Sequence, residues 1–444
     1  MLTLWHTLWF GFTQTSIITG WLPITFEVIT ILTIAITVNW KSRRYRRSFL
    51  VGLGISAAVT FIVATVLWLT SVTPPDIPPW PYVWGFVFLL ALWICISEWT
   101  HLNRKRRVIS ILSVVLALAC TLGAINVFTE TFITVYRLGS LQPEQVVDQQ
   151  QVNDMQQQVN ATGKLPSHGV VFETTIPPVQ SDFQTRKAYV YLPPAWFATK
   201  KPLLPTIVML PGEPGSAADW SSGGTADETA DAFAAAHNGL APILVMPDSN
   251  GIKTVDSECV NSQFGNAETY LAVDVPAYAI NQLHASPAAG AMAIAGLSAG
   301  GTCSMILALN HPNVYQTFAS YSGFTAPQYE NDTVQQTIDI LFGGSKSKYE
   351  AASPITIFET SPDGFGQLSG WFEAGSDDTE TADAARILQP LAAKAGISTC
   401  VLIRPGGHDF ELWSQAFADS LPWLSWQIGL TSQPKTEPAK CVTP

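Results

Sequence analysis

A serine flanked by small residues is the side chain in this sequence best suited to nucleophilic chemistry. Ser298 lies in Gly-Leu-Ser-Ala-Gly at residues 296–300, after the apolar run 291–295 and before a helix-like stretch that ends near Asn310. A strand, a sharp turn and a helix are the context in which the G-x-S-x-G motif exposes a serine hydroxyl. The helix N-terminus would favour negative charge developing there. We predict that Ser298 is a nucleophile; the alternative is a glycine-rich turn with an incidental serine.

A nucleophilic serine requires a general base, and two histidines follow Ser298. His311 lies at the end of the helix predicted after the serine, too far along it to reach back. His408 lies in Gly-Gly-His-Asp-Phe at residues 406–410, between the last predicted strand and the last predicted helix. A loop at the carboxyl end of a strand can present a base, so we predict that His408 is the base. The alternative is a surface histidine in a glycine-rich turn.

An acid is needed to orient the histidine and stabilise its charged form. The loop at residues 375–380 follows the preceding predicted strand and contains Asp377, Asp378 and Glu380. In many enzymes with this arrangement the acid stands three residues after the glycine, which favours Asp378. Asp377 and Glu380 remain alternatives.

Two backbone donors are expected to stabilise the oxyanion. One is the N–H of Ala299, the residue after the nucleophile, and the other should come from the loop after an early strand. Leu-Pro-Gly-Glu-Pro-Gly at residues 210–215 follows such a strand. Since Pro211 and Pro214 have no N–H, Glu213 is the expected donor; the alternative is an ordinary Pro/Gly turn.

The elements that must position these residues alternate between strands and helices over residues 165–430. Strands are expected at 170–176, 188–192, 206–210, 243–247, 291–297, 317–322, 369–373 and 399–403. Helices are expected at about 226–237, 268–284, 300–310, 382–395 and 410–427. This alternation predicts an α/β domain with a mostly parallel sheet and helices on both faces. The first two strands have no helix between them and should form an antiparallel edge.

Residues 1–130 have the pattern of a membrane region. Four apolar runs lie at about 17–39, 49–71, 82–100 and 108–128, each near the roughly 20 residues needed to cross a bilayer. All nine basic residues of this region lie in two short segments, 41–47 and 104–107, predicted to be loops. By the positive-inside rule both segments are cytoplasmic, so the chain after residue 130 is expected outside the cytoplasm. A Gln-rich linker is predicted at 131–164, as a spacer or an exposed helix, and a flexible tail is predicted at 431–444.

Residues of about 165–430 resemble the α/β-hydrolase-fold serine esterases, a group that includes feruloyl esterases, S-formylglutathione hydrolase-like esterases and actinobacterial mycolyltransferases. The resemblance is carried by Leu-Pro-Gly at 210–212, the serine motif extended to Gly301, and the segment 406–410. Asp-Ser-Glu-Cys at 256–259 and Gly-Thr-Cys at 301–303 also resemble actinobacterial members with multi-spanning N-termini. The acid of mycolyltransferases is typically a glutamate, so Asp377-Asp378 favours a general esterase.

Cysteine usage follows the two predicted compartments. Cys95 and Cys120 lie in membrane runs, whereas four cysteines would face an oxidising exterior. We predict a Cys259–Cys303 disulfide that ties the loop after strand 243–247 to the helix after Ser298. A Cys400–Cys441 bond is a weaker prediction, because a strand cysteine can be buried and free.

Composition excludes several other classes. The chain has 23 basic and 34 acidic residues, a net charge of −11, which argues against nucleic-acid binding. The histidine spacing is unlike a metal site, and no phosphate-binding glycine loop is present, so neither metal nor cofactor is expected.

The sequence therefore predicts a membrane-anchored serine esterase acting outside the cytoplasm on lipid or cell-envelope esters, such as acyl or aminoacyl lipids. Trp220, Tyr270, Trp371 and Phe372 are candidates for an apolar substrate pocket, with core packing as their alternative role. Two other functions remain open: an acyltransferase that moves acyl chains onto a sugar or lipid, and a non-catalytic envelope-binding protein.

Overall fold

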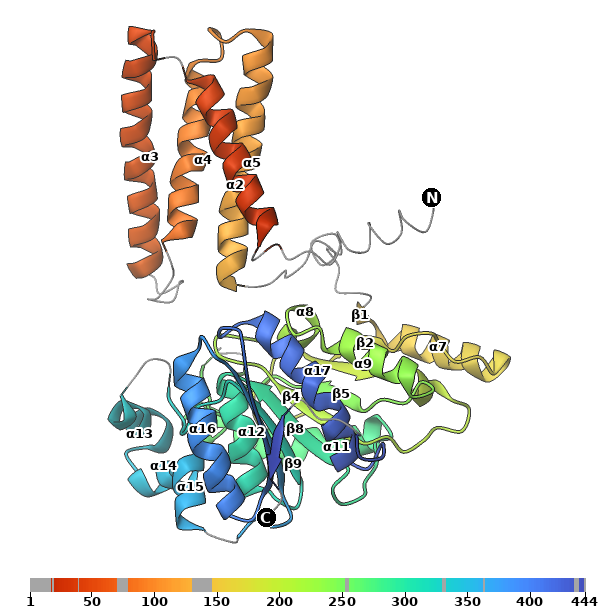
Figure 1. Ribbon diagram of the computed structural model, residues 1–444. Coiled ribbons are helices and arrows are strands. Elements are labelled where there is room, and N and C mark those ends of the chain that lie inside the picture. The colour runs from red at the N-terminus through yellow and green to blue at the C-terminus, as the bar shows by residue number, and fades with distance from the viewer. Residues whose placement is uncertain are drawn as a thin grey trace. The chain divides into compact units, whose positions relative to one another are not determined.

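The computed structural model describes residues 17, 20–38, 40–69, 79–129, 146–251, 255–329, 333–361, 364–434 and 439–442. The chain divides into two compact units, residues 1–141 and 142–444. Each unit is described by itself below (Figure 1).

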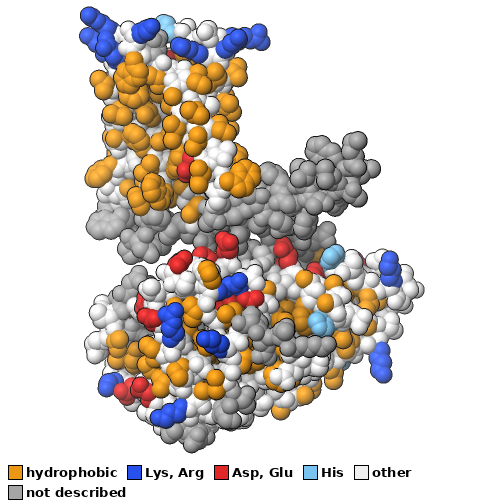
Figure 2. Space-filling view, in the orientation of Figure 1, with side chains coloured by type: hydrophobic (Ala, Val, Ile, Leu, Met, Phe, Trp, Pro, Cys, Tyr) orange, Lys and Arg blue, Asp and Glu red, His pale blue; other side chains and the backbone are white. Residues whose placement is uncertain are grey.

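The first unit contains four apolar helices: α2 (Trp21–Thr37), α3 (Arg43–Leu69), α4 (Trp80–Ser97) and α5 (Arg104–Thr129). Helices α3, α4 and α5 are long and apolar enough to span a membrane, whereas α2, with 17 residues, is shorter. Their outward surfaces are apolar (Figure 2), as is typical of helices that face lipid. Parts of the predicted runs, including residues 18–19, 39 and 70–71, lie outside the described residues.

Most of the basic residues of this unit lie in helices rather than in loops, which corrects the sequence prediction. Helix α3 begins at Arg43 and helix α5 at Arg104, so the basic residues from 43 to 47 and from 104 to 107 form the first turns of these helices. Long arginine and lysine side chains can extend to water while their backbone stays helical. Figure 2 shows these side chains gathered at one end of the helical unit.

The second unit is built on a ten-stranded sheet in the order β1-β2-β3-β5-β4-β8-β9-β10-β11-β12. Its strands are β1 (Val146–Val147), β2 (Val170–Thr174), β3 (Ala188–Leu192), β4 (Thr206–Leu210), β5 (Ile243–Met246), β8 (Met292–Leu297), β9 (Thr317–Tyr321), β10 (Ser369–Gly375), β11 (Ser398–Arg404) and β12 (Lys440–Val442). The six strands from β5 to β11 run parallel, and β3 is antiparallel to both β2 and β5. All eight predicted strands are present, and the predicted antiparallel edge is confirmed.

Helices cover both faces of this sheet. One face packs against α7 (Gln149–Thr162), α11 (Val275–Gln282), α12 (Ala299–Asn310), α15 (Pro354–Thr360) and α16 (Thr379–Lys394). The other packs against α9 (Ala226–Ala236) and α17 (Phe410–Gln427). Along β4 the side chains of Ile207 and Met209 enter the second core, and Val208 and Leu210 enter the first. This alternation buries both faces of the strand, which is why it reads as a continuous apolar run.

Shorter elements complete the second unit. They are η1 (Pro194–Phe197), α8 (Asp219–Ser222), the pair β6 (Asn261–Ser262) and β7 (Gly265–Asn266), α10 (Ala267–Thr269), the π-helical turn η2 (Tyr270–Asp274), α13 (Val334–Phe342) and α14 (Lys346–Ala351). Helices α13, α14 and α15 lie between β9 and β10, where the sequence analysis predicted no helix.

The Gln-rich segment belongs in part to the second unit rather than to a free linker. Strand β1 pairs with β2, and α7 begins with a capping box formed by Asp148 and Gln151. Val152 and Val159 of this helix are buried in the core. Apolar residues seven apart on a polar helix form a narrow stripe, which suffices to dock it.

The end of the chain also differs from the prediction of a flexible tail. Strand β12 pairs antiparallel with β11, and Cys441 forms a disulfide with Cys400. The pairing supplies β11 with a neighbour on its outer edge, which would otherwise expose unpaired backbone groups.

The four aromatic residues considered for a substrate pocket are core residues instead. The side chains of Trp220, Tyr270, Trp371 and Phe372 are at most 1% exposed. Because large aromatic side chains bury the most apolar area, core packing is their common role.

Candidate active site

Ser298 occupies a tight turn between β8 and α12. Its backbone has φ 55° and ψ −123°, a conformation that non-glycine residues rarely adopt. The turn depends on its two glycines, because a Cβ at Gly296 would lie 2.0 Å from the Gly300 carbonyl oxygen. A Cβ at Gly300 would lie 2.3 Å from the Pro211 carbonyl oxygen. Small residues are thus required on both sides of the serine for the strand, the helix and the β4 loop to approach.

A continuous hydrogen-bonded chain joins the serine, a histidine and an aspartate. Ser298 Oγ lies 2.8 Å from His408 Nε2, and His408 Nδ1 lies 2.7 Å from Asp378 Oδ2. The three residues follow β8, β11 and β10, respectively, and lie at the carboxyl ends of these parallel strands. The order of the strands in the sheet therefore brings together residues that are 110 and 30 positions apart in the sequence.

Asp378 is the carboxylate that meets the histidine. Asp378 is the N-cap of α16, and its carboxylate accepts hydrogen bonds from the backbone N–H and from the hydroxyl of Thr381. Burial by itself would raise the pKa of Asp378, but hydrogen bonds from His408 and Thr381 outweigh burial and lower the pKa below its usual value. The carboxylate is thus held in its charged form, facing the imidazole.

The two alternative acids lie elsewhere. The exposed Asp377 accepts a hydrogen bond from the Ser376 hydroxyl at 3.3 Å. Glu380 lies in the first turn of α16 and lines a groove beside the site. His311, the other histidine after the serine, pairs with Glu268 at 2.9 Å instead.

Two aromatic rings lie near the ring of the histidine. Trp413 contacts the His408 ring edge-on, with centroids 5.0 Å apart, and Phe324 lies 6.1 Å from it. Neither ring was singled out from the sequence, because nothing in the local pattern distinguishes them from core aromatics.

The two segments expected to supply the oxyanion donors lie beside the serine. Ala299 is the first residue of α12, and the first N–H groups of a helix have no intrahelical acceptor. Across from it, a Cβ at Gly212 would lie only 3.1 Å from Ser298 Cβ, so the β4 loop passes directly by the serine. Glu213 follows in this loop, and its carboxylate accepts a hydrogen bond from Asn250. Ala299 thus directly follows Ser298, and the loop that carries Glu213 passes beside the serine at Gly212.

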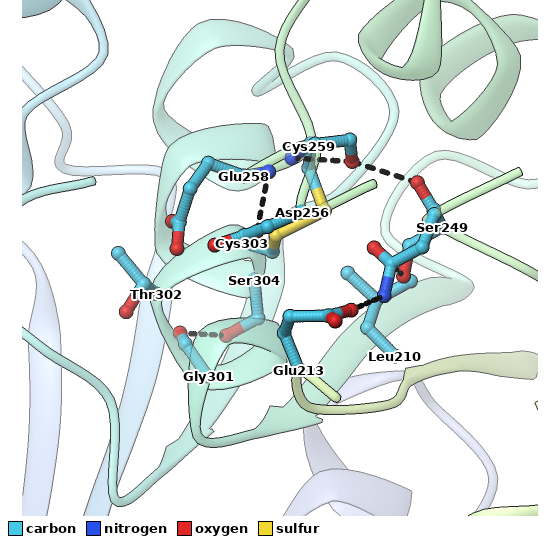
Figure 3. Close-up of a disulfide and its surroundings, with 12 residues drawn as sticks. Leu210, Glu213, Ser249, Asp256, Glu258, Cys259, Gly301, Thr302, Cys303 and Ser304 are labelled. Atoms are coloured by element: carbon cyan, nitrogen blue, oxygen red, sulfur yellow. Dashed lines mark hydrogen bonds between the residues drawn. A yellow bond between two sulfur atoms is a disulfide. The ribbon is translucent and has the colours of Figure 1, made fainter. Parts of the chain in front are cut away.

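A disulfide ties a neighbouring loop to the helix that begins at the serine. Cys259 and Cys303 are bonded, with their Cα atoms 5.5 Å apart. Figure 3 shows this bond together with Asp256 and Glu258, which precede Cys259 in the loop. The loop is therefore anchored five residues after Ser298.

A groove of about 540 Å³ lies on the Phe324 side of the site. It is lined by Phe324, Thr325, Ala326, Pro327, Gln328, Thr333, Val334, Thr337, Tyr349, Glu380, Asp383, Ala384 and Ile387. Phe324 lines the groove and its ring also lies 6.1 Å from the ring of His408, so the groove adjoins the hydrogen-bonded residues. Among the residues that the structure describes, no group of three or more His, Cys, Asp or Glu could hold a metal ion.

The sequence was compared with known families and proteins. Residues 183–424 match the model of the Esterase family, described as "Putative esterase". An uncharacterized protein of Corynebacterium glutamicum is 31% identical over 423 residues, which cover 90% of this chain and 95% of the relative.

Solved structures with a similar second unit include a ferulic acid esterase, which is 20% identical with a TM-score of 0.49 and aligns over 59% of this chain and 99% of that one. An S-formylglutathione hydrolase from Agrobacterium tumefaciens is 16% identical with a TM-score of 0.49, over 60% of this chain and 98% of that one.

The chain belongs to the Esterase family, since the family model covers more than half of its residues. Its second unit has the α/β-hydrolase fold, and the family resemblance expected from the serine and histidine motifs is confirmed.

Proposed function

We propose that this member of the Esterase family is a membrane-anchored serine esterase that hydrolyses carboxylic esters outside the cytoplasm. The observation that carries the proposal is the hydrogen-bonded chain Ser298–His408–Asp378 at a strained turn between a strand and a helix. Such a constellation activates a serine hydroxyl, which is a weak nucleophile on its own.

In the first half-reaction Ser298 Oγ attacks the ester carbonyl carbon while His408 Nε2 accepts the hydroxyl proton. The carbonyl π electrons move to oxygen, and the resulting oxyanion is stabilised by the N–H groups of Ala299 and Glu213. His408 then donates its proton to the leaving alcohol oxygen as the C–O bond breaks. The products are an acyl-serine and the free alcohol.

In the second half-reaction water attacks the acyl-serine. His408 accepts a proton from the water and later returns it to Ser298 Oγ, which releases a carboxylic acid. Throughout, Asp378 stabilises the imidazolium and holds Nδ1 as the donor. The low pKa of Asp378 supports this role, because the carboxylate must remain charged when His408 is protonated.

The location is inferred from the two units. Helices α3, α4 and α5 are long and apolar enough to span a membrane. The basic first turns of α3 and α5 favour an orientation with these ends in the cytoplasm and the second unit outside. Two disulfides in the second unit support an oxidising compartment. Tethering would restrict the active site to esters near the membrane, which favours lipid or cell-envelope esters as substrates.

The proposal is tested with a fluorophosphonate probe on the full-length chain in detergent. We expect covalent labelling of the wild type, with the adduct mapped by mass spectrometry to Ser298. Ser298→Ala should abolish labelling, whereas Ser347→Ala, at an exposed serine on α14, should label normally. Labelling that persists in Ser298→Ala, or that is absent from the wild type, would exclude Ser298 as the nucleophile.

A further inference from the structure

The described charged side chains that line the groove beside the candidate active site are acidic. Within the part of the chain that the structure describes, Glu380 and Asp383 are the only ionic side chains among its lining residues, and that set contains no Lys, Arg or His. Asp383 has a counter-ion outside the lining, Arg386, at 2.7 Å. The rest of the described lining is apolar or neutral, so the charge that a substrate meets on these lining side chains is negative.

A buried carboxylate adjoins the same groove. Glu258 is 3% exposed, and its carboxylate accepts a hydrogen bond from the backbone N–H of Gln328, a lining residue. Burial raises the pKa of Tyr349, another lining residue, and the nearby Glu258 raises it further. Glu258 Oε2 has no hydrogen-bond partner among the described residues. A buried carboxylate oxygen without a donor is costly, and it indicates a missing partner that can donate.

The neighbouring charges also indicate a cation as that partner. Burial raises the pKa of Glu258 well above its usual value, and the nearby Asp256 and Glu213 raise it further. Figure 3 shows the side chains of Asp256 and Glu258 side by side next to α12. A positive group placed between them would remove their repulsion and supply the absent donor.

The loop that carries these carboxylates is held in an unfavourable conformation. Glu258 and Cys259 have φ values of 44° and 55°, in the left-handed region that non-glycine residues usually avoid. The Cys259–Cys303 bond attaches the loop to the helix of the nucleophile. Glu258 therefore has a defined position relative to Ser298, as a specificity residue requires.

We propose that Asp256 and Glu258 bind a protonated amino group of the substrate, so that the preferred substrates are esters whose acyl part carries an ammonium group. Lysine-like or alanine-like acyl groups satisfy this description, whereas unmodified fatty acyl groups do not. The inference rests on the proposed esterase function and specifies its substrate class.

The test compares matched esters of one fluorogenic alcohol with the full-length chain in detergent at neutral pH. Two pairs are used, alanyl against propionyl and 6-aminohexanoyl against hexanoyl, because they differ by the amino group and place it at two distances. We expect kcat/KM to be about tenfold or more higher for the amino member of at least one pair, equivalent to about 1.4 kcal/mol.

Glu258→Gln should lower this ratio of amino to neutral ester by about tenfold. Glu359→Gln removes an exposed carboxylate from α15 and should leave the ratio unchanged. Labelling by the uncharged fluorophosphonate probe shows that each variant retains a folded site. If Glu258→Gln does not label, Asp256→Asn takes its place.

Hydrolysis of both esters with equal kcat/KM in the wild type, or a ratio that Glu258→Gln and Asp256→Asn leave unchanged, would overturn the substrate inference while the esterase function stands. Absence of labelling and of hydrolysis of every ester in the wild type would overturn both.

Discussion

Asp378 Oδ2 lies 2.7 Å from His408 Nδ1, and the same aspartate is the N-cap of α16. The helix end also holds the carboxylate, through the backbone N–H and the hydroxyl of Thr381. A residue that caps a helix loses little further freedom when it also orients a neighbouring histidine.

Asp378→Asn should lower kcat for ester hydrolysis by about 10³–10⁴-fold, because an amide cannot stabilise the imidazolium or enforce the same tautomer. Asp377→Asn is the matched control, because Asp377 is exposed and directly precedes Asp378 in the sequence. We expect the control to stay within about threefold of the wild type. Steady-state kinetics on a single ester measure kcat for both variants. An equal loss of kcat in Asp378→Asn and Asp377→Asn would contradict the proposed role of Asp378.

Glu373 on β10 should make the folded state less stable as pH rises. Burial is the main reason that the pKa of Glu373 is raised to about 8, and the nearby Asp419 adds to the shift. Between the unfolded pKa of about 4.5 and the folded value, the native state holds a proton that the unfolded state has lost. The stabilisation that Glu373 contributes to the folded state is therefore fully present below about pH 4.5 and is lost as the pH rises through about 8.

Glu373→Gln should flatten this dependence, which urea unfolding followed by tryptophan fluorescence at several pH values would show. The exposed Glu359→Gln variant serves as the control and should keep the wild-type slope. A Glu373→Gln protein with the wild-type slope would show that Glu373 titrates equally in both states.

The Cys259–Cys303 bond closes a segment of 44 residues and should stabilise the second unit. Replacing both cysteines with serine is expected to lower the free energy of unfolding by roughly 2–4 kcal/mol. Replacing Cys400 and Cys441 together should reduce fluorophosphonate labelling less than replacing Cys259 and Cys303 does. The Cys400–Cys441 bond joins β11 to β12, whereas the Cys259–Cys303 bond is attached to α12, the helix that follows Ser298. Peptide mapping without reductant provides the direct check, and free thiols at Cys259 and Cys303 would contradict the bond.

The orientation across the membrane can be measured by cysteine labelling in intact cells. Gln150→Cys, on the exposed surface of α7, should react with a membrane-impermeant maleimide. Arg44→Cys, in the first turn of α3, should react only after permeabilisation. The unsubstituted chain measures the background from native cysteines. The reverse pattern would place the second unit in the cytoplasm.

Local sequence pattern was sufficient for much of this protein. The strand before Ser298 and the helix after it follow from their apolar character and the glycines between them, because tight turns depend on neighbouring residues. The eight strands that were predicted are present for the same reason. His408 could be singled out because His311 lies at the far end of the helix that follows Ser298, too far from the serine to reach it.

Tertiary structure alone decided the features that depend on contacts distant in sequence. Asp377, Asp378 and Glu380 are similar in type and lie within four positions, so only the helix cap and the 2.7 Å contact with His408 distinguish Asp378. The same holds for the Gln-rich segment, which docks through two buried valines, and for the tail, which pairs with β11. Glu258 and the groove residues lie far apart along the chain, so their carboxyl groups come together only once the loops have folded. Periodicity records which face of an element is buried, but not which distant surface covers it.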